Sequence, residues 1–410
     1  MKVNLKAEAL VHGGEALARH EGRVVFLHGA APGDTVEAEL TGEGRFERTR
    51  ALRVLQRGQA RVDPPCPIVE RCGGCPVQHV SYQAQLAAKQ ELTADALERI
   101  GGFPRGSYEL APIVASPKQF HYRRRARMHR AGSGRWGFAQ VGTATIQPVE
   151  ECLLFEPILQ QLADVVRAAG DLPGVTDLAL LAGDGKGALD LRVEGSVTPG
   201  LRRRAERLLE NRLVRGVTLG GALLGDPVIA DPPLPNGARL RARPDTFAQA
   251  NRGMVPVLQR ETALALAGAT RLIELYCGSG TLTLPLLAPG REVLAVESAG
   301  RALALLRRSA DEAGLQVKLL AGDAATVMRG SAERHFDAVL LDPPRTGAAD
   351  AVRALATAHS PRVVYVSCDA PTLARDAKLL AQSGYRLARA LPLDLFPQTA
   401  HFEVVATFLR

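Results

Sequence analysis

Cysteine is the residue type with the most chemical potential in this sequence, because a thiolate can ligate a metal or attack a carbon atom. The chain has six cysteines, and four of them lie in the first half: Cys66, Cys72, Cys75 and Cys152. The other two, Cys277 and Cys368, each end an apolar run in the second half. The first group suggests a metal centre, and the second group suggests a nucleophile.

The spacing of the first group is Cys66-x5-Cys72-x2-Cys75, with Cys152 far downstream. Four thiolates suit a tetrahedral zinc ion or an iron–sulfur cluster. Zinc ribbons usually carry two C-x-x-C pairs, and only one is present here, so spacing leaves the two centres about equally favoured. Buried cysteines without a metal would not explain the clustering.

Cys368 ends the run VVYVSC, which we expect to be a buried strand. A free cysteine is more often a small apolar core residue. However, ligands of parallel sheets bind beyond the carboxyl ends of the strands, where Cys368 would stand. DPPR (342–345) closes the adjacent predicted strand, where two prolines stiffen a loop that could press a planar group against a ligand. The last strand opens with His401-Phe402-Glu403, which places a carboxylate near the same rim.

A ligand-binding turn is indicated by the segment ELYCGSGT, in which Gly278 and Gly280 allow a tight turn and a close approach of the backbone. Glu297 ends the next predicted strand, where a carboxylate can accept both hydroxyls of a ribose. Asp323 follows a further apolar segment and is placed to meet an adenine edge. A dinucleotide-binding turn would have a third glycine, which is absent, so S-adenosylmethionine fits better than NAD.

Three domains are expected from 410 residues and from the changes of pattern along them. Short strands separated by Gly and Asp predict a small β-barrel over residues 1–55. Residues 56–235 hold the cysteine-rich loop, a helix from about Tyr82 to Ile100, and a strand-rich α+β region. Residues 236–410 alternate apolar strands with helices, which predicts a doubly wound α/β domain with a parallel sheet.

The composition favours a polyanionic partner, since the formal charge is +8 and the pI about 9.4. In HYRRRAR, strand alternation puts Arg123, Arg125 and Arg127 on one face. A charge run alone is more often a solvated face, but next to a site that acts on nucleic acid it would favour phosphate contacts. No run of about 18 apolar residues and no signal peptide is present, so we predict a cytoplasmic protein without a membrane span.

Six motifs occur in chain order: HYRRRAR (121–127), PDTFAQAN (244–251), ELYCGSG (274–280), DPPR (342–345), SCDAPTLARD (367–376) and LFPQTAHFE (395–403). Together with the cysteine pattern, they resemble the RNA uridine-5-methyltransferase family over essentially the whole chain. Residues 1–55 resemble the TRAM barrel, an OB-like RNA-binding module of these enzymes. The combination of a TRAM-like barrel and a cysteine cluster resembles the 23S ribosomal RNA branch more than the bacterial transfer RNA branch.

The resemblance implies a class I methyltransferase domain that uses S-adenosylmethionine. It assigns Cys368 as nucleophile, Glu403 as the base that removes the carbon 5 proton, and Asp342 to the site between cofactor and base. Cofactor contacts are implied for Gln249, Tyr276, Gly278, Gly280, Thr281, Glu297, Asp323 and Asp342. The four clustered cysteines are implied to hold a 4Fe–4S cluster, and we expect a monomer that binds RNA, ribosomal rather than transfer RNA, and flips the target uridine out of its stack.

Two positions depart from the family pattern. Asp369 and Ala370 follow Cys368 where the family usually has Asn-Pro, and we expect Asp369 to point away from the sulfur. Thr281 stands where Asn is common. The rival readings are an amino-group methyltransferase, whose loop has an aromatic residue where Arg345 stands, and a non-catalytic RNA-binding iron–sulfur protein.

Overall fold

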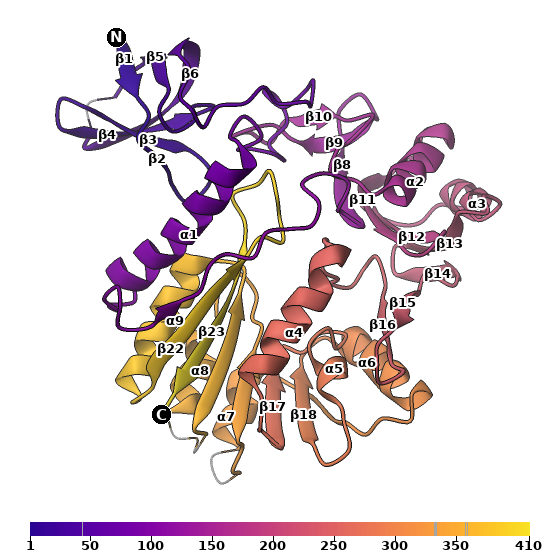
Figure 1. Ribbon diagram of the computed structural model, residues 1–410. Helices are drawn as coiled ribbons and strands as arrows, with labels where there is room; N and C mark the ends of the chain where they lie inside the picture. Colours follow the sequence, from indigo (N-terminus) through magenta and orange to yellow (C-terminus); the bar gives the residue numbers. More distant parts are fainter. Residues whose placement is uncertain (43, 332–333, 357, 359) are drawn as a thin grey trace.

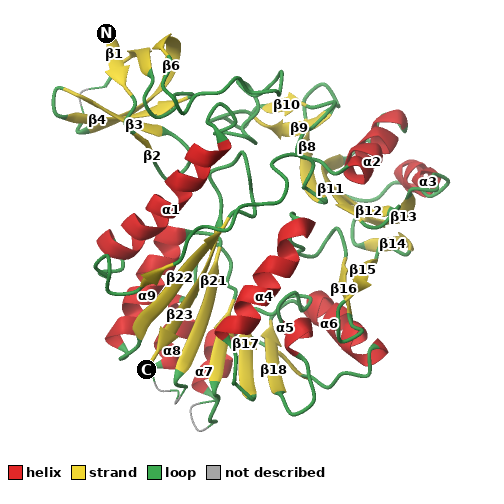
Figure 2. Ribbon diagram, in the orientation of Figure 1, coloured by secondary structure: helices red, strands yellow, loops and turns green. Residues whose placement is uncertain are grey.

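A computed structural model describes the chain from residue 1 to 410 except residues 43, 332–333, 357 and 359. Figure 1 shows three parts: an amino-terminal barrel, a central sheet with two helices, and a large carboxyl-terminal sheet between helices. Figure 2 shows that the chain leaves the barrel as a long loop, which leads to helix α1 (Tyr82–Arg99). Among the described residues, no helix is both long enough and apolar enough to cross a membrane.

The amino-terminal barrel is a six-stranded sheet with the strand order β1-β5-β6-β4-β3-β2. Alternate residues of its strands face inward, as Val25 and Leu27 of β4 and Val36 and Ala38 of β5 do. This arrangement confirms the small β-barrel that the sequence predicts. The strands are β1 (Lys2–Lys6), β2 (Ala9–Leu10), β3 (Ala16–His20), β4 (Arg23–His28), β5 (Thr35–Glu39) and β6 (Phe46–Gln56).

The central part is a seven-stranded sheet with the order β10-β9-β8-β11-β12-β13-β14. Helices α2 (Pro157–Ala168) and α3 (Pro199–Leu208) pack on it through apolar residues such as Leu162 and Leu201, which share one core with the strands. The strands are β8 (Arg125–Arg130), β9 (Trp136–Ala139), β10 (Ile146–Pro148), β11 (Val175–Ala182), β12 (Gly187–Val193), β13 (Val214–Leu219) and β14 (Ala222–Gly225).

The carboxyl-terminal sheet has the order β19-β18-β17-β20-β21-β23-β22-β7. Its first five strands are parallel, and β23 is antiparallel to both neighbours. This confirms the predicted doubly wound domain. Its strands are β17 (Arg271–Leu275), β18 (Glu292–Glu297), β19 (Lys318–Ala321), β20 (Ala338–Leu341), β21 (Arg362–Ser367), β22 (Arg386–Leu393) and β23 (Glu403–Leu409), with β7 (Glu109–Leu110) at the edge.

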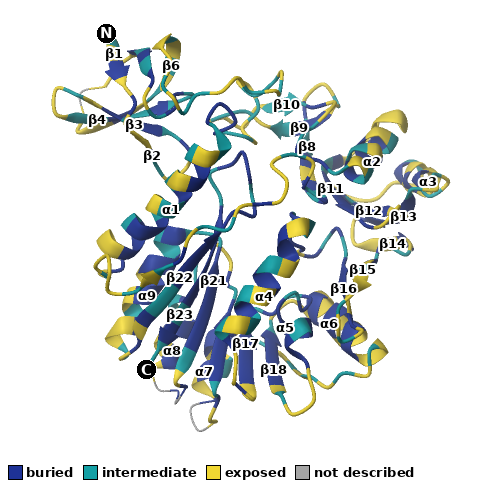
Figure 3. Cartoon of the chain, viewed as in Figure 1, coloured by how far each residue is buried: buried dark blue, intermediate teal, exposed yellow. Residues whose placement is uncertain are grey.

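Helices cover both faces of this sheet, so its inner strands are largely buried and β20 is buried at every residue (Figure 3). Alternate residues of β21 serve two cores, because Val363 and Tyr365 face one helical layer while Val364 and Val366 face the other. The helices are η1 (Arg252–Met254), α4 (Val255–Ala265), α5 (Thr283–Leu286), α6 (Gly300–Glu312), α7 (Ala324–Arg329), α8 (Ala349–Leu355) and α9 (Ala370–Gln382).

The domain limits predicted from the sequence do not coincide with the units into which the chain packs. Helix α1 (Tyr82–Arg99) falls in the range predicted as the central domain, yet Leu97 joins the core of the carboxyl-terminal sheet. Buried Lys89 forms a 2.7 Å ion pair with buried Asp394, which ties the helix to that domain. Likewise, the limit at residue 235 runs through the hairpin of β15 (Ile229–Pro233) and β16 (Arg239–Ala242).

Candidate active site and four-cysteine centre

A cavity of about 710 Å³ opens where β17, β18, β20 and β21 end. The parallel strands deliver their last residues to one edge, and the loops that follow diverge to opposite faces, which leaves a crevice. Its volume lies in the range of sites for small molecules and cofactors. Cys368, Asp342 and Glu403 all line this cavity, so the structure brings the three predicted catalytic residues together.

One end of the cavity is built by the turn after β17. Tyr276, Gly278 and Gly280 all have positive φ angles, of 63°, 54° and 90°. A side chain at position 280 would place its Cβ 2.4 Å from Leu306 Cδ1, so only glycine fits there. Tyr276 has a strained backbone conformation that non-glycine residues rarely adopt. Such conformations occur most often at ligand sites.

Glu297 closes this turn from the end of β18. Its Oε2 accepts a 3.0 Å hydrogen bond from the backbone N–H of Gly278, and its Oε1 accepts one of 2.8 Å from Ala299. Each carboxylate oxygen has two lone pairs, so both can still accept a hydroxyl. Glu297 lines the cavity, as expected of a residue that would bind a ribose.

Gln249, Thr281 and Asp323 are also predicted to contact the cofactor, and their surroundings differ from one another. Buried Gln249 lines the cavity, and within the described chain its Oε1 has no hydrogen-bond partner, as a group awaiting a ligand would. Thr281 also lines it, while its backbone carbonyl accepts a 2.8 Å hydrogen bond from Gln259. Asp323 is exposed at the amino end of α7, where it accepts a hydrogen bond from Thr326, and it does not appear among the residues lining the cavity.

Asp323 nevertheless acts on the site through its charge. Burial raises the pKa of the Tyr276 hydroxyl to about 12, and the Asp323 carboxylate is the next largest cause. The rim therefore combines a glycine turn, a carboxylate at the end of β18, an unpaired buried amide oxygen and a nearby second carboxylate. This donor set fits a cofactor that carries a nucleoside.

The other end of the cavity holds the thiol and two carboxyl groups. Burial raises the pKa of the Cys368 thiol to about 11, and the Glu403 charge raises it further. Glu403 is only 4% exposed, and burial followed by the charge of Asp342 raises its pKa. Burial also raises the pKa of Asp342. When two carboxyl groups lie close together in a buried site, the charge of one opposes ionisation of the other. The pair therefore keeps a proton more readily than two separate carboxyl groups would.

Sequence reasoning missed three residues of this cavity. Arg345 follows the two prolines of DPPR, and its positive charge lowers the pKa of both Cys368 and Glu403. Glu274 is buried in the middle of β17, where burial raises its pKa to about 8; a carboxylate inside the apolar run RLIEL was the available signal. Phe247 is 62% exposed at the cavity wall, and an exposed aromatic ring cannot be recognised from sequence alone.

Asp369 does not make its hydrogen bonds with the neighbouring sulfur. Its carboxylate accepts a 2.9 Å hydrogen bond from the backbone of Thr372 and so caps α9. It also pairs with His12 of the barrel at 3.3 Å. These partners agree with the expectation that Asp369 points away from Cys368.

The predicted arginine face also borders the cavity. Arg123, Arg125 and Arg127 all line it, whereas Arg124 between them is buried and pairs with Asp231. In the described part of the chain, the Nε atoms of Arg123 and Arg125 are buried without a hydrogen-bond partner. Unpaired guanidinium donors beside a cavity suit phosphate oxygens.

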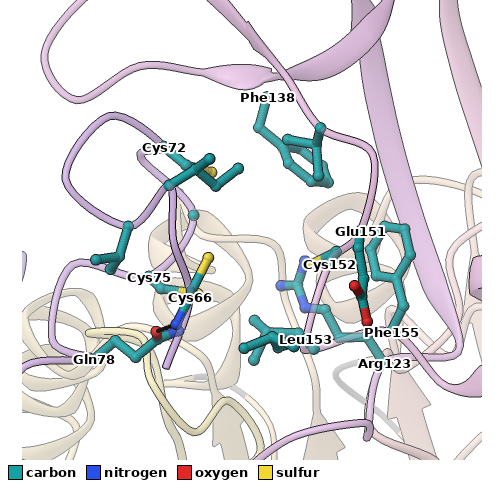
Figure 4. Close-up of a pocket in the computed structure, with 15 residues that line it drawn as sticks. Cys66, Cys72, Cys75, Gln78, Arg123, Phe138, Glu151, Cys152, Leu153 and Phe155 are labelled. Atoms are coloured by element: carbon teal, nitrogen blue, oxygen red, sulfur yellow. Dashed lines mark hydrogen bonds between the residues drawn. The ribbon is translucent and has the colours of Figure 1, made fainter. Parts of the chain in front are cut away.

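The four cysteines of the first half surround a separate hollow. Figure 4 shows Cys66, Cys72 and Cys75 on one side of it and Cys152 on the other. Burial raises the pKa of Cys75 and Cys152, the latter to about 11, and their neighbouring thiols add to the effect. The described residues include no group of three or more Cys, His, Asp or Glu side chains placed to hold a metal ion.

This geometry bears on the kind of centre that the thiols could hold. A single zinc ion needs its sulfurs about 2.3 Å from one point, so the four would have to converge tightly. A four-iron cluster is larger and keeps its thiolates farther apart. The four thiols that line the hollow are a donor set that either group would accept.

Known proteins match this chain over essentially its whole length. The family described as tRNA (Uracil-5-)-methyltransferase matches residues 238–410, and the TRAM domain family matches residues 1–42. The 23S rRNA (uracil(1939)-C(5))-methyltransferase RlmD of Pseudomonas putida is 35% identical, with 99% of this chain and 93% of the relative covered. The enzyme of the same name from Dechloromonas aromatica is 32% identical, with 98% of each covered.

An uncharacterized RNA methyltransferase of Gloeobacter violaceus is 34% identical over 100% of this chain and 96% of its own length. Among solved structures, the tRNA (uracil-54, C5)-methyltransferase of Pyrococcus abyssi, in complex with S-adenosyl-L-homocysteine, superposes with a TM-score of 0.76. It is 22% identical, with 99% of both chains covered, and supports the fold.

Proposed function

The chain belongs to the family of RNA (uracil-5-)-methyltransferases, and from this membership we propose that it methylates carbon 5 of a uridine in 23S ribosomal RNA, with Cys368 as nucleophile. The observation that carries the proposal is the meeting of Cys368, Asp342 and Glu403 in one cavity beside the glycine turn. S-adenosylmethionine is the methyl donor of this family.

Carbon 5 of uracil is a poor nucleophile, and the thiolate of Cys368 would correct this by adding to carbon 6. The ring then carries enolate character at carbon 5, which can accept a methyl group. The bound cofactor supplies that electrophilic methyl group. Burial disfavours the free thiolate, so the Arg345 guanidinium is needed to offset part of the cost.

The reaction ends when carbon 5 loses its proton and the bond between carbon 6 and sulfur breaks. Glu403 would take this proton, because it is the buried carboxyl group of the cavity whose raised pKa makes its ionised form a strong base. Asp342 would bind between the cofactor and the base, where its own raised pKa lets it retain a proton. The thiolate of Cys368 then leaves, and the double bond between carbons 5 and 6 is restored.

The mechanism is tested by trapping. RNA that contains 5-fluorouridine has no carbon 5 proton to lose, so the wild-type protein should remain covalently bound to it on a denaturing gel. Cys368→Ala should give no such band. Cys277→Ala, which changes the buried cysteine of the glycine turn after β17, should retain it. Absence of the band with wild-type protein would contradict the proposal.

Ribosomal RNA is proposed as the substrate because the full-length relatives at 32% and 35% identity are named as 23S enzymes. Transfer RNA is the alternative, since the similar solved structure is named as a transfer RNA enzyme. Mapping of 5-methyluridine in both RNAs from a deletion strain separates the two. Loss from 23S RNA alone supports the proposal, and loss from transfer RNA alone contradicts it.

The arginine face is proposed to hold RNA phosphates next to the cavity, with Arg123, Arg125 and Arg127 as the contacts. The target uridine must leave its stack to reach Cys368, so we expect a loop or single-stranded segment as substrate. The exposed ring of Phe247 at the cavity wall offers a stacking surface for a displaced base. A ribosomal substrate implies a cytoplasmic location, and we propose that the protein acts as a monomer.

Cys66, Cys72, Cys75 and Cys152 are proposed to hold a 4Fe–4S cluster. The proposed reaction transfers no electrons, so the cluster would tie the loop of residues 66–75 to the central domain and position the RNA. Anaerobic purification should give a brown protein, and Cys152→Ser should be colourless, with Cys277→Ser as the coloured control. A colourless wild-type protein with one equivalent of zinc would contradict the assignment.

A further inference from the structure

The turn between β2 and β3 of the barrel contacts two segments next to the catalytic cavity, at Asp369 and at Ala400. The turn is closed by a 2.8 Å hydrogen bond from the N–H of Val11 to the carbonyl of Glu15. Gly14 has φ +87°, and a Cβ there would lie 3.0 Å from Val77 Cγ1 and 3.3 Å from Ala400 Cβ. Because Ala400 lies three residues before Glu403, the barrel packs directly on the segment that carries the proposed base.

His12 extends from this turn to the residue next to the proposed nucleophile. Its Nε2 lies 3.3 Å from Oδ2 of Asp369, and the two side chains are 49% and 22% exposed. The same carboxylate caps α9 through the N–H of Thr372. The backbone of Asp369 is held as well, since its N–H donates a 3.2 Å hydrogen bond to Ser367 Oγ. Ser367 and Thr372 are neighbours of Asp369 in the chain, whereas His12 comes from another domain.

The position of Asp369 next to Cys368 explains why a partner for its carboxylate is useful. A carboxylate beside a thiol opposes formation of the thiolate, and the charge of Asp369 is one of those that act on Cys368 in this way. Where the related pattern has an uncharged Asn, no such opposition arises. An imidazole N–H that donates to the carboxylate orients Asp369 and competes for the lone pairs that would otherwise face the sulfur.

We propose that His12 is a positioning residue for the methyl transfer, by which the barrel binds the Asp369 carboxylate and holds its orientation beside Cys368. The inference rests on the proposed role of Cys368 as nucleophile. It gives the barrel a part in the chemical step, in addition to any affinity for RNA.

The test compares the rate of covalent bond formation with the affinity for RNA. We expect His12→Ala to slow adduct formation with 5-fluorouridine RNA about three- to tenfold at saturating RNA, because an ion pair at a partly exposed site contributes modestly. The Kd for RNA should stay within about twofold. Lys2→Ala removes an exposed barrel cation that pairs with Glu37 instead, and should leave the adduct rate unchanged.

The double variant isolates the proposed contact. In an Asp369→Asn background the opposing charge is gone, so His12→Ala should have no further effect on the adduct rate. His12→Gln keeps a donor without the charge, and should fall between wild type and His12→Ala. His12 is half exposed, so the melting temperatures of these variants should match that of wild type.

Three outcomes separate the inference from the function on which it rests. If wild-type protein forms no adduct, the proposed function fails first. If wild type reacts and His12→Ala reacts equally fast, the function stands and the role of His12 is overturned. Equal slowing by His12→Ala in the wild-type and Asp369→Asn backgrounds would also overturn it, because the effect would then not pass through Asp369.

Discussion

At the residue scale, Cys368, Asp342 and Glu403 share the catalytic cavity with the guanidinium of Arg345. Burial raises the pKa of Cys368, Asp342 and Glu403, and each of the two carboxylates opposes ionisation of the thiol. Arg345 is the cation that acts in the opposite direction on Cys368 and Glu403. The site therefore favours the neutral forms of these acids more strongly than water does.

The proposed base leads to a clear prediction. Glu403→Gln removes the group that accepts the carbon 5 proton but keeps a side chain of the same size. Addition of Cys368 and methyl transfer can proceed, whereas elimination cannot, so the adduct should accumulate on ordinary RNA. Turnover should fall by about 10²- to 10⁴-fold. The measurement is a denaturing gel with labelled RNA, and normal turnover without a shifted band would rule out this role.

Arg345 gives a prediction about pH. Replacement of the guanidinium in Arg345→Gln should raise the thiol pKa further above about 11, so less thiolate is present at neutral pH. Adduct formation should be about three- to tenfold slower. Between pH 7 and 9 both proteins lie below the thiol pKa, so both rates should rise with pH while their ratio stays constant.

Adduct rates measured at several pH values check this directly. Arg353→Gln is a suitable control, because its guanidinium pairs with Asp350 on α8 and does not border the cavity. Equal rates for Arg345→Gln and wild type at pH 7 would show that the guanidinium does not support the thiolate.

At the element scale, helix α1 supports the loop that leads to Glu403. Lys89 of this helix and Asp394 form a buried ion pair, and Lys89 also donates to the carbonyl of Phe396. Gln85, one turn earlier, accepts a hydrogen bond from the N–H of Gln398. A helix that precedes the catalytic domain by more than a hundred residues thus holds the segment before β23.

Breaking this pair should be costly. Lys89→Met leaves the Asp394 carboxylate buried without its cation, which typically costs about 3–5 kcal/mol of unfolding free energy. Lys89→Met combined with Asp394→Leu should recover part of the loss, because no uncompensated charge remains. Urea unfolding of the single and double variants measures both effects. A loss below about 1 kcal/mol in the single variant would mean that the pair is not buried in solution.

At the scale of the whole molecule, two domains meet around one cavity and the barrel contacts a residue beside it. The central sheet contributes the arginine face, the carboxyl-terminal sheet contributes the glycine turn and the acids, and His12 of the barrel contacts Asp369, which follows Cys368 in the chain. The net charge of +8 supplies a general attraction for RNA. The arginine face is where that attraction would act on the strand that enters the cavity.

Salt dependence tests this placement. If Arg127 contacts a phosphate, Arg127→Gln should lower the slope of log affinity against log salt by about 0.7, the value for one contact with single-stranded nucleic acid. Arg203→Gln removes an exposed charge from α3, which does not border the cavity, and should leave the slope unchanged. Identical slopes for Arg127→Gln and wild type would remove Arg127 from the RNA interface.

Local patterns in the sequence determined much of this protein. The alternation of strands and helices, the glycine turn and the position of Cys368 at a strand end are all properties of short segments. Alternation alone placed Arg123, Arg125 and Arg127 on one face. These predictions succeeded because backbone geometry sets them over a few residues.

Only the tertiary structure decided which distant segments meet. It brought His12 to Asp369 and Lys89 to Asp394, gave Arg345 its effect on the thiol, and left Asp323 exposed at a helix end rather than on the cavity wall. The physical reason is that burial and charge–charge distance depend on packing between elements, and no local pattern encodes them. The same limit applies to the four cysteines, because their spacing along the chain does not state how closely their sulfurs converge.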